Sequence, residues 1–250
     1  MIGAVFEPTM EATIVKKKSV VIFGVVVLTL IALAALAASP NPYTFSQNGR
    51  TVTSNEAPSS AMPSNHDTTL KTIAGNLSTY KFGVFFCCFG NTIAAGPPNF
   101  PFQTWVAIPF TPTADATVTR VEASVGTFGG SDAGAFRLQL LADNNNSPGT
   151  SIKNFPISTE PTYGACCTLD IGNDQAGIPV KKGTQYWLAV TTSAKQTAFP
   201  GGWAFNSTDM RSHEIASWCK GSSTYCGTNS GVWVVGQSGD PLPGYAILGN

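Results

Sequence analysis

The sequence predicts an all-β protein, an antiparallel β-sandwich of jelly-roll-like arrangement that follows an amino-terminal signal helix and a disordered linker. Three observations predict this organisation. Short apolar segments alternate with turn residues, no long window beyond the amino-terminal region carries a helical stripe, and one long apolar run lies near the start of the chain. We expect the signal at residues 1–37, the linker at 38–66 and the β-sandwich domain at 67–250.

The amino-terminal region has the pattern of an export signal. Residues 16–18 are all Lys, residues 20–38 form an almost uninterrupted apolar run, and Ala35 and Ala37 provide an A-x-A cleavage site. The run is also long enough to cross a bilayer as an uncleaved membrane anchor. Because basic residues hold the amino end inside the cell, both alternatives place the rest of the chain outside the cytoplasm.

The segment after the signal has the composition of a linker. Residues 38–66 are rich in Ser, Pro, Asn and Thr and contain few large apolar side chains. Such a segment buries too little surface to offset its ordering entropy. We therefore expect an exposed spacer that extends as far as His66.

Alternation of apolar and polar residues predicts strands in the remaining chain. VEASV at 121–125 and FRLQL at 136–140 place every second side chain on one face. Further strands are expected at 80–88, 104–110, 152–157, 166–171, 185–191, 202–205, 231–235 and 245–248. The segment DNNNSPG at 143–149 predicts a tight turn, because Asn and Gly tolerate left-handed backbone. Short strands at this spacing, without crossover helices, are typical of an antiparallel sandwich or jelly roll.

The charge composition excludes several classes of function. The chain has 14 basic and 14 acidic residues, and only 11% of its residues are charged. A nucleic-acid binder needs clustered Lys and Arg, which this balance does not supply. We therefore expect no nucleic-acid partner, and contact with a membrane only through the amino-terminal segment where that segment is uncleaved.

The cysteines indicate an oxidising compartment. The six are Cys87, Cys88, Cys166, Cys167, Cys219 and Cys226. Cys219 and Cys226 flank a short loop and are predicted to bridge a hairpin. The two doublets are predicted to bridge one another, because neighbouring side chains of a strand point to opposite faces. A thiolate zinc site is the alternative, and the spacing of the cysteines disfavours it.

No residue pattern indicates an enzyme. The two histidines are His66 in the linker and His213 in a loop, and no G-x-S-x-G nucleophile elbow is present. The carboxylates are scattered singly, so no acid pair stands out for glycoside hydrolysis. We expect a non-enzymatic protein with no catalytic residues.

The Asn-rich turn is a weak candidate for a Ca²⁺ site. Asp143, Asn145 and Ser147 alternate as oxygen ligands do around Ca²⁺, but no closing bidentate Glu lies nearby in the sequence. An ordinary turn rich in Asn and Asp is the favoured interpretation, and no other cofactor is expected.

Aromatic residues near Gly-rich loops predict a sugar-binding surface as an alternative function. Trp203, Trp218 and Tyr225 are the candidates, since exposed aromatic rings stack on flat apolar surfaces. Trp187 and Trp233 lie in predicted strands and are expected in the core.

Three segments carry a resemblance to a known family. LQLLAD at 138–143, SPGT at 147–150 and GTQYWLAV at 183–190 together resemble the bacterial choice-of-anchor R domain. The resemblance extends over roughly residues 68–250. It implies a secreted β-sandwich carried by bacterial surface proteins, with no catalytic residues to transfer. The six cysteines depart from the pattern of that family.

The sequence as a whole predicts an exported, non-enzymatic β-sandwich with a structural or adhesive role. We expect it outside the cell, at the cell surface or in the periplasm. The alternative is a carbohydrate-binding module that contacts a polysaccharide or another component of the cell envelope.

Overall fold

The computed structural model describes residues 43–47, 50–54, 66–77, 85–96, 102–127, 136–155, 168–192, 200–206, 209, 211–221, 226–227 and 231–250. The chain divides into two units, 1–42 and 43–250, and all described residues belong to the second unit. The predicted signal at 1–37 therefore lies outside them. Within the described ranges, no helix has the length and apolar character needed to cross a membrane.

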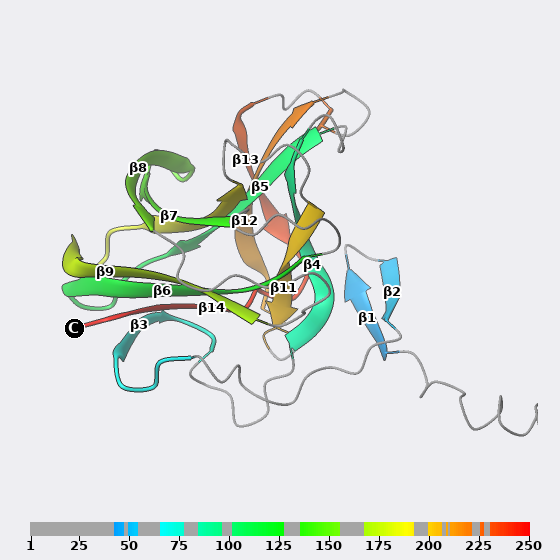
Figure 1. The fold of residues 1–250 in the computed structure, drawn as a ribbon. Helices are drawn as coiled ribbons and strands as arrows, with labels where there is room; N and C mark the ends of the chain where they lie inside the picture. Colours follow the sequence, from blue (N-terminus) through cyan, green and yellow to red (C-terminus); the bar gives the residue numbers. More distant parts are fainter. Residues whose placement is uncertain are drawn as a thin grey trace, which may run out of the picture. The chain divides into compact units, whose positions relative to one another are not determined.

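The described residues are nearly all antiparallel β-strand (Figure 1). The strands are β1 (Tyr43–Gln47), β2 (Arg50–Ser54), β3 (Lys71–Gly75), β4 (Phe85–Ala95), β5 (Phe102–Phe110), β6 (Ala116–Thr127), β7 (Phe136–Asp143), β8 (Pro148–Phe155), β9 (Thr168–Val180), β10 (Tyr186–Thr192), β11 (Pro200–Asn206), β12 (His213–Gly221), β13 (Trp233–Ser238) and β14 (Tyr245–Gly249). Each segment predicted as a strand overlaps one of these strands, which confirms the all-β prediction.

Part of the predicted linker is a β-hairpin. β1 and β2 pair in an antiparallel register that runs from Tyr43↔Ser54 to Gln47↔Arg50. The expectation of a linker without structure is therefore wrong at these two strands. The sequence contains a signal for the hairpin, because Asn48-Gly49 is a dipeptide typical of two-residue hairpin turns and β-branched residues follow it.

The strands from β3 to β14 form one hydrogen-bonded network. Its main path has the order β3-β14-β6-β11-β4-β5-β10-β7-β8, while β9 pairs with β6, and β12 pairs with β5 and β13. One strand group thus contains β3, β14, β6 and β9. A second group contains β13, β12, β5, β10, β7 and β8, and β11 and β4 connect the two groups. Figure 1 shows β9, β6 and β14 running side by side.

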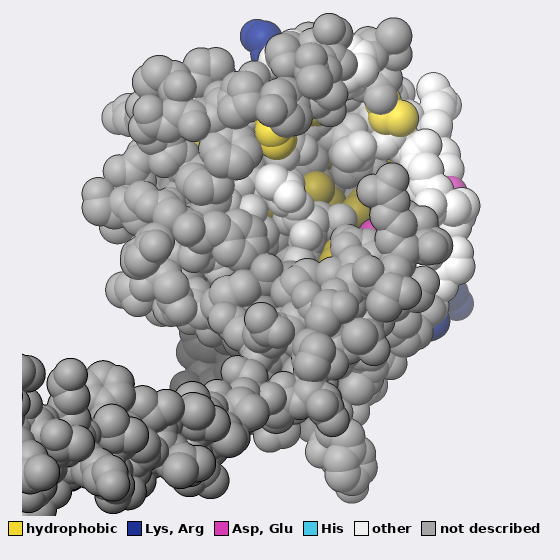
Figure 2. Space-filling view, turned by 90° about the vertical axis from the view of Figure 1, so that its right-hand side faces the viewer, with side chains coloured by type: hydrophobic (Ala, Val, Ile, Leu, Met, Phe, Trp, Pro, Cys, Tyr) yellow, Lys and Arg dark blue, Asp and Glu magenta, His cyan; other side chains and the backbone are white. Residues whose placement is uncertain are grey.

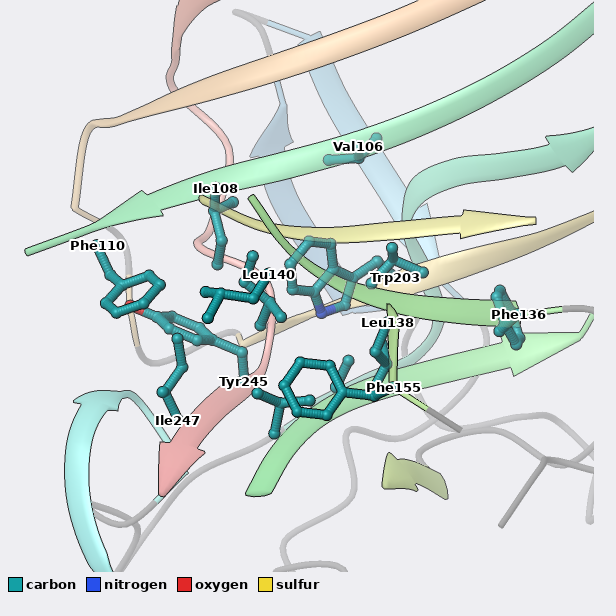
Figure 3. Packing of buried hydrophobic residues seen from close by; sticks show 14 of the residues in the cluster. Val106, Ile108, Phe110, Phe136, Leu138, Leu140, Phe155, Trp203, Tyr245 and Ile247 are labelled. Carbon is teal, nitrogen blue, oxygen red and sulfur yellow. The ribbon is translucent and has the colours of Figure 1, made fainter. Parts of the chain in front are cut away.

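The two strand groups share one apolar core. Val121 of β6 and Ile247 of β14 belong to the same buried cluster as Ile108 of β5, Leu140 of β7 and Leu188 of β10. Figure 3 shows labelled side chains from both groups directed toward a common interior. This arrangement is consistent with the predicted β-sandwich, in which alternate residues of each strand face the shared core.

The strand groups also meet along β8 and β9. Lys153 Nζ on β8 lies 2.7 Å from Asp174 Oδ2 on β9. Next to this ion pair, Phe155 packs directly on Gly172, where an added Cβ would lie 2.3 Å from the Cβ of Phe155. Only glycine allows this close approach, which brings one strand of each group together at the side of the core.

Candidate functional site

Residues 66–77, which we call the strap, supply the edge strand β3 and cover part of the outer face of the first strand group with Leu70 and Leu77. The strap includes β3, which pairs with β14. A second buried cluster lies beneath it and contains Leu77, Leu169, Ile171, Ala246 and Leu248. These residues alternate along the strands with the residues of the main core, so the first group is buried on both faces.

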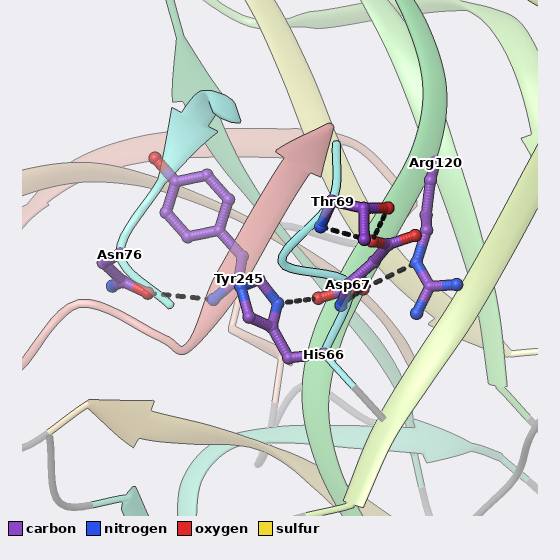
Figure 4. A network of polar contacts seen from close by, with 7 residues as sticks. His66, Asp67, Thr69, Asn76, Arg120 and Tyr245 are labelled. Carbon is purple, nitrogen blue, oxygen red and sulfur yellow. Dashed lines mark hydrogen bonds and ion pairs between the residues drawn. The ribbon is translucent and has the colours of Figure 1, made fainter. Parts of the chain in front are cut away.

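A buried carboxylate connects the strap to the sheet (Figure 4). The side chain of Glu122, on β6, is fully buried. Its Oε1 accepts hydrogen bonds from Arg120 Nε at 2.6 Å and from the backbone N–H of Asp67 at 3.1 Å. Its Oε2 lies 2.5 Å from Nδ1 of His66, a side chain that is only 2% exposed. A buried charge of this kind is tolerated because it is paired and hydrogen-bonded.

His66 is therefore part of the folded domain and not of an exposed spacer, which corrects the sequence-based expectation. The turn after it is fixed by Asp67, whose Oδ1 accepts hydrogen bonds from the hydroxyl and the backbone N–H of Thr69 at 2.6 and 2.8 Å. These two hydrogen bonds hold the pKa of the Asp67 carboxyl below its ordinary value. The sequence did not reveal the contact, since Glu122 lies 56 residues from His66.

Asn76 and Asp209 form a second polar cluster at the end of the strap. Asn76 Oδ1 accepts a hydrogen bond from the backbone N–H of Tyr245 at 3.0 Å, and Asn76 Nδ2 donates to the carbonyl of Pro243 at 2.9 Å. Burial alone would raise the pKa of Asp209, but hydrogen bonds from Arg211 outweigh it and lower that pKa. Burial raises the pKa of Tyr245 to about 12. All of these groups hold loops and strands in place.

His213 lies at the start of β12 and is half-buried, so the expectation of a solvated loop residue is wrong. Its Nδ1 lies 3.1 Å from the carbonyl oxygen of Arg211. A carbonyl only accepts hydrogen bonds, so Nδ1 carries the proton. Its Nε2 is buried and has no hydrogen-bond partner in the described part of the chain. Burial lowers the pKa of His213, because the charged, doubly protonated ring is less well solvated here than in water.

The Asn-rich turn, residues 143–149, covers one end of the outer face of the second strand group. Asp143 Oδ1 accepts hydrogen bonds from Trp187 Nε1 at 2.8 Å and from Gln185 Nε2 at 3.0 Å. Asp143 Oδ2 accepts from the backbone N–H of Asn146 at 3.1 Å. Asn146 Nδ2 in turn donates to Glu214 Oε1 on β12 at 3.0 Å. The turn is thereby folded back over the sheet, and Trp187 beneath it is fully buried.

The candidate Ca²⁺ ligands lie in this turn. Asn145 and Asn146 have left-handed backbone, with φ of 52° and 61°, as the sequence predicted for Asn at these positions. Burial alone would raise the pKa of Asp143, but hydrogen bonds led by that from Trp187 lower it. Both carboxylate oxygens of Asp143 are thus occupied by protein donors, and the carbonyl of Ser147 accepts from Asn144 N–H. No group of three or more metal-binding side chains occurs among the described residues, and the Ca²⁺ site remains a prediction.

At the other end of this face, three indoles stand in line. Trp105 on β5, Trp218 on β12 and Trp233 on β13 occupy directly opposed positions of neighbouring strands. We call these three residues the tryptophan row. All three are half-buried. The rings of Trp105 and Trp218 are stacked, with centroids 4.0 Å apart and planes 13° apart. The row therefore combines a fixed aromatic pair with partial access to solvent.

The sequence-based aromatic candidates separate in the structure. Trp203 is fully buried in the main core, and its Nε1 donates to the carbonyl of Gly244 at 2.9 Å. This corrects the expectation of a solvent-facing Trp203. Trp218 is half-buried in the tryptophan row, and Tyr225 lies outside the described residues. The sequence missed Trp105, because no strand was predicted at β12, through which the three residues come into register. Trp233 was expected in the core; it is half-buried and packs against the buried cluster that contains Trp187.

The predicted disulfide between Cys219 and Cys226 is confirmed, with an S–S distance of 2.02 Å. It closes the connection between β12 and β13, next to Trp218. The side chains of Cys87, Cys88, Cys166 and Cys167 lie outside the described residues, so their pairing remains a prediction. A disulfide fits an oxidising compartment.

Large exposed apolar side chains are few in the described part of the chain, namely Ile152 and Val232. On the face drawn in Figure 2, described hydrophobic atoms reach the surface only in a few separate spots. The three indoles of the tryptophan row are only partly accessible. No protein-family model, no curated protein and no solved structure matches this chain.

Proposed function

We propose that this chain is an exported, non-enzymatic β-sandwich of jelly-roll type that acts as a structural or adhesive module at the cell surface. The observation that carries the proposal is the Cys219–Cys226 disulfide, which staples the β12–β13 connection. Disulfides persist in oxidising compartments and are rare in the cytosol. The apolar run at residues 20–38 and the resemblance to the choice-of-anchor R domain support the same location and role.

The use of the titratable groups supports a structural role. Glu122 and Asp143 accept hydrogen bonds that fix the strap and the Asn-rich turn. Asp209 holds Arg211 by two hydrogen bonds of 2.6 Å. These carboxylates are engaged in positioning the backbone and neighbouring side chains, which favours a stable scaffold over acid–base chemistry.

Fractionation of the native host tests this proposal. We expect the chain in the surface or secreted fraction, accessible to a protease that does not cross membranes. Non-reducing mass spectrometry should show the peptide that joins Cys219 to Cys226. The amino terminus of the exported chain should distinguish cleavage after Ala37 from retention of residues 20–38 as an anchor. A reduced, protease-protected chain in the cytosol would contradict the proposal.

A carbohydrate-binding module is the second candidate, and Trp218 favours it. This indole is half-buried on an outer sheet face and stacks with a second indole. A partly accessible ring of this kind offers apolar surface that a sugar ring can contact. Trp203 no longer contributes to this candidate, because it is buried in the core.

A further inference from the structure

We propose that the tryptophan row is a binding site for a neutral, extended polysaccharide. The proposal rests on the second candidate function above and names its site, its ligand class and two residues, Trp105 and Trp233, that the sequence did not assign to it. Register is the first observation. Trp218 is opposite Trp105 on one side and opposite Trp233 on the other, so all three indoles share the outer face of the second strand group.

The row is rigid before any ligand binds. Trp105 Nε1 donates a hydrogen bond of 2.9 Å to Thr192 Oγ1, and its ring stacks on Trp218. Beside Trp218, the Cys219–Cys226 disulfide and a 2.6 Å hydrogen bond from Gly231 N–H to the carbonyl of Cys219 hold the end of β12. Rings that are already held in place lose little conformational freedom on binding, which favours affinity.

The row also differs in exposure from the other described indoles. Trp187 and Trp203 are fully buried, whereas the three indoles of the row are half-buried. Trp105 and Trp218 cover one face of each other, and each keeps partial access to solvent. Trp233, on β13, packs in part against the buried cluster that contains Trp187 and Ala216, and the rest of its surface remains accessible.

The charge of the surrounding strands selects the ligand class. β5 and β13 contain no charged residue, and β12 between them contains one acidic and one basic residue, Glu214 and Lys220. Next to the aromatic pair, Gln103 and Lys220 lie opposite each other and supply amide and ammonium donors. A nucleic acid or an acidic polymer would need several cationic partners. Flat rings beside a few hydrogen-bond donors instead suit a neutral, hydroxyl-rich chain. Its extended form matches an aromatic row that crosses three neighbouring strands.

The test measures binding of the full chain, with its disulfide intact, to neutral and acidic polysaccharides. The probes are cellulose, chitin and their soluble hexasaccharides as extended neutral chains, and polygalacturonate as an acidic chain. We expect retention on at least one neutral probe. Trp233→Ala and Trp218→Ala should each weaken binding of the hexasaccharide about tenfold, which corresponds to the loss of one stacking contact. Trp218→Phe should retain part of the affinity, since it keeps a ring.

Ile152→Ala is the matched control, because it removes an exposed apolar side chain from β8 and should leave binding unchanged. If Trp218→Ala disturbs the neighbouring disulfide, the binding measured for Trp233→Ala decides the test. Binding to polygalacturonate alone, absence of binding to every neutral probe, or binding that survives both alanine variants would overturn the inference. An exported, oxidised chain that binds no glycan would refute this site and leave the proposed structural role intact.

Discussion

The outer faces of the two strand groups are covered in different ways. On the first strand group the strap covers the sheet, buries a second apolar cluster and engages the Glu122 carboxylate. On the second group the Asn-rich turn covers one end, and the tryptophan row at the other end is half-buried. Both faces follow from the same alternation of residues along strands. Both faces bury an apolar cluster, and the second also has a half-buried aromatic row, where we propose that a ligand binds.

Replacing Trp203 should have the largest effect on stability. Trp203→Ala leaves a cavity in the main core and removes the donor to the Gly244 carbonyl, so we expect a loss of about 3–5 kcal/mol in the free energy of unfolding. Trp233→Ala, in the row, should cost clearly less because its side chain is half-buried. Denaturant titration of both variants measures the difference. Equal losses would mean that the row is as much a part of the core as Trp203.

Removing the charge of Glu122 should have the next largest effect. Glu122→Gln leaves Arg120 and His66 beside a neutral amide in a buried site, which we expect to cost about 3 kcal/mol. Lys181→Ala is the matched control, since it breaks the ion pair with Asp115 at a position where both side chains are exposed. Exposed pairs add little to stability.

Thermal or denaturant unfolding of these two variants shows whether the contacts of Glu122 stabilise the fold or add little to its stability. Glu122→Gln should also make the strap more susceptible to limited proteolysis, because its attachment to β6 is weakened. A Glu122→Gln variant as stable and as resistant as the parent chain would show that β3, Leu77 and the hydrogen bonds of Asn76 hold the strap without the Glu122 contacts.

The sequence predicts the strands and their inward faces better than it predicts the contacts on the outer faces. Alternation at 121–125 and 136–140 depends only on neighbouring residues, so the strands and their inward faces were predictable. The contact between His66 and Glu122, and the register of the tryptophan row, depend on pairings between distant segments. No local pattern encodes such pairings. Trp203 was misplaced for the same reason, since a Gly-rich neighbourhood does not reveal which strand face is covered.

Opening the disulfide beside the tryptophan row should have an intermediate effect. The double substitution Cys219→Ser and Cys226→Ser removes a cross-link between residues seven positions apart. Loop-closure entropy predicts a loss of about 2–3 kcal/mol in unfolding free energy. Because the bond adjoins Trp218, the change should also alter near-ultraviolet circular dichroism of the indoles. Unfolding curves of the parent and the double variant, both measured without reductant so that any other disulfide is retained, make the comparison, and superimposable curves would contradict the expectation.

The smallest predicted effect is a pH dependence that arises from His213, at the start of β12. Burial holds the pKa of this ring below its ordinary value of 6.5, against the opposing attraction of Asp209 and Asp240. The unfolded chain therefore binds more protons than the folded chain just below pH 6.5. The contribution of His213 is fully present above that pH and is lost as the pH falls toward the folded-state pKa.

The slope of unfolding free energy against pH measures this contribution. Over the range of about pH 5 to 7.5, where His titrates, the parent chain should lose stability on acidification with a slope of at most about 1.4 kcal/mol per pH unit from this group. His213→Gln should show a smaller slope, because its amide does not titrate. His66 is present in both proteins, so the difference isolates His213. Identical slopes would mean that His213 is as accessible to protons in the fold as in the unfolded chain, and that the start of β12 opens locally.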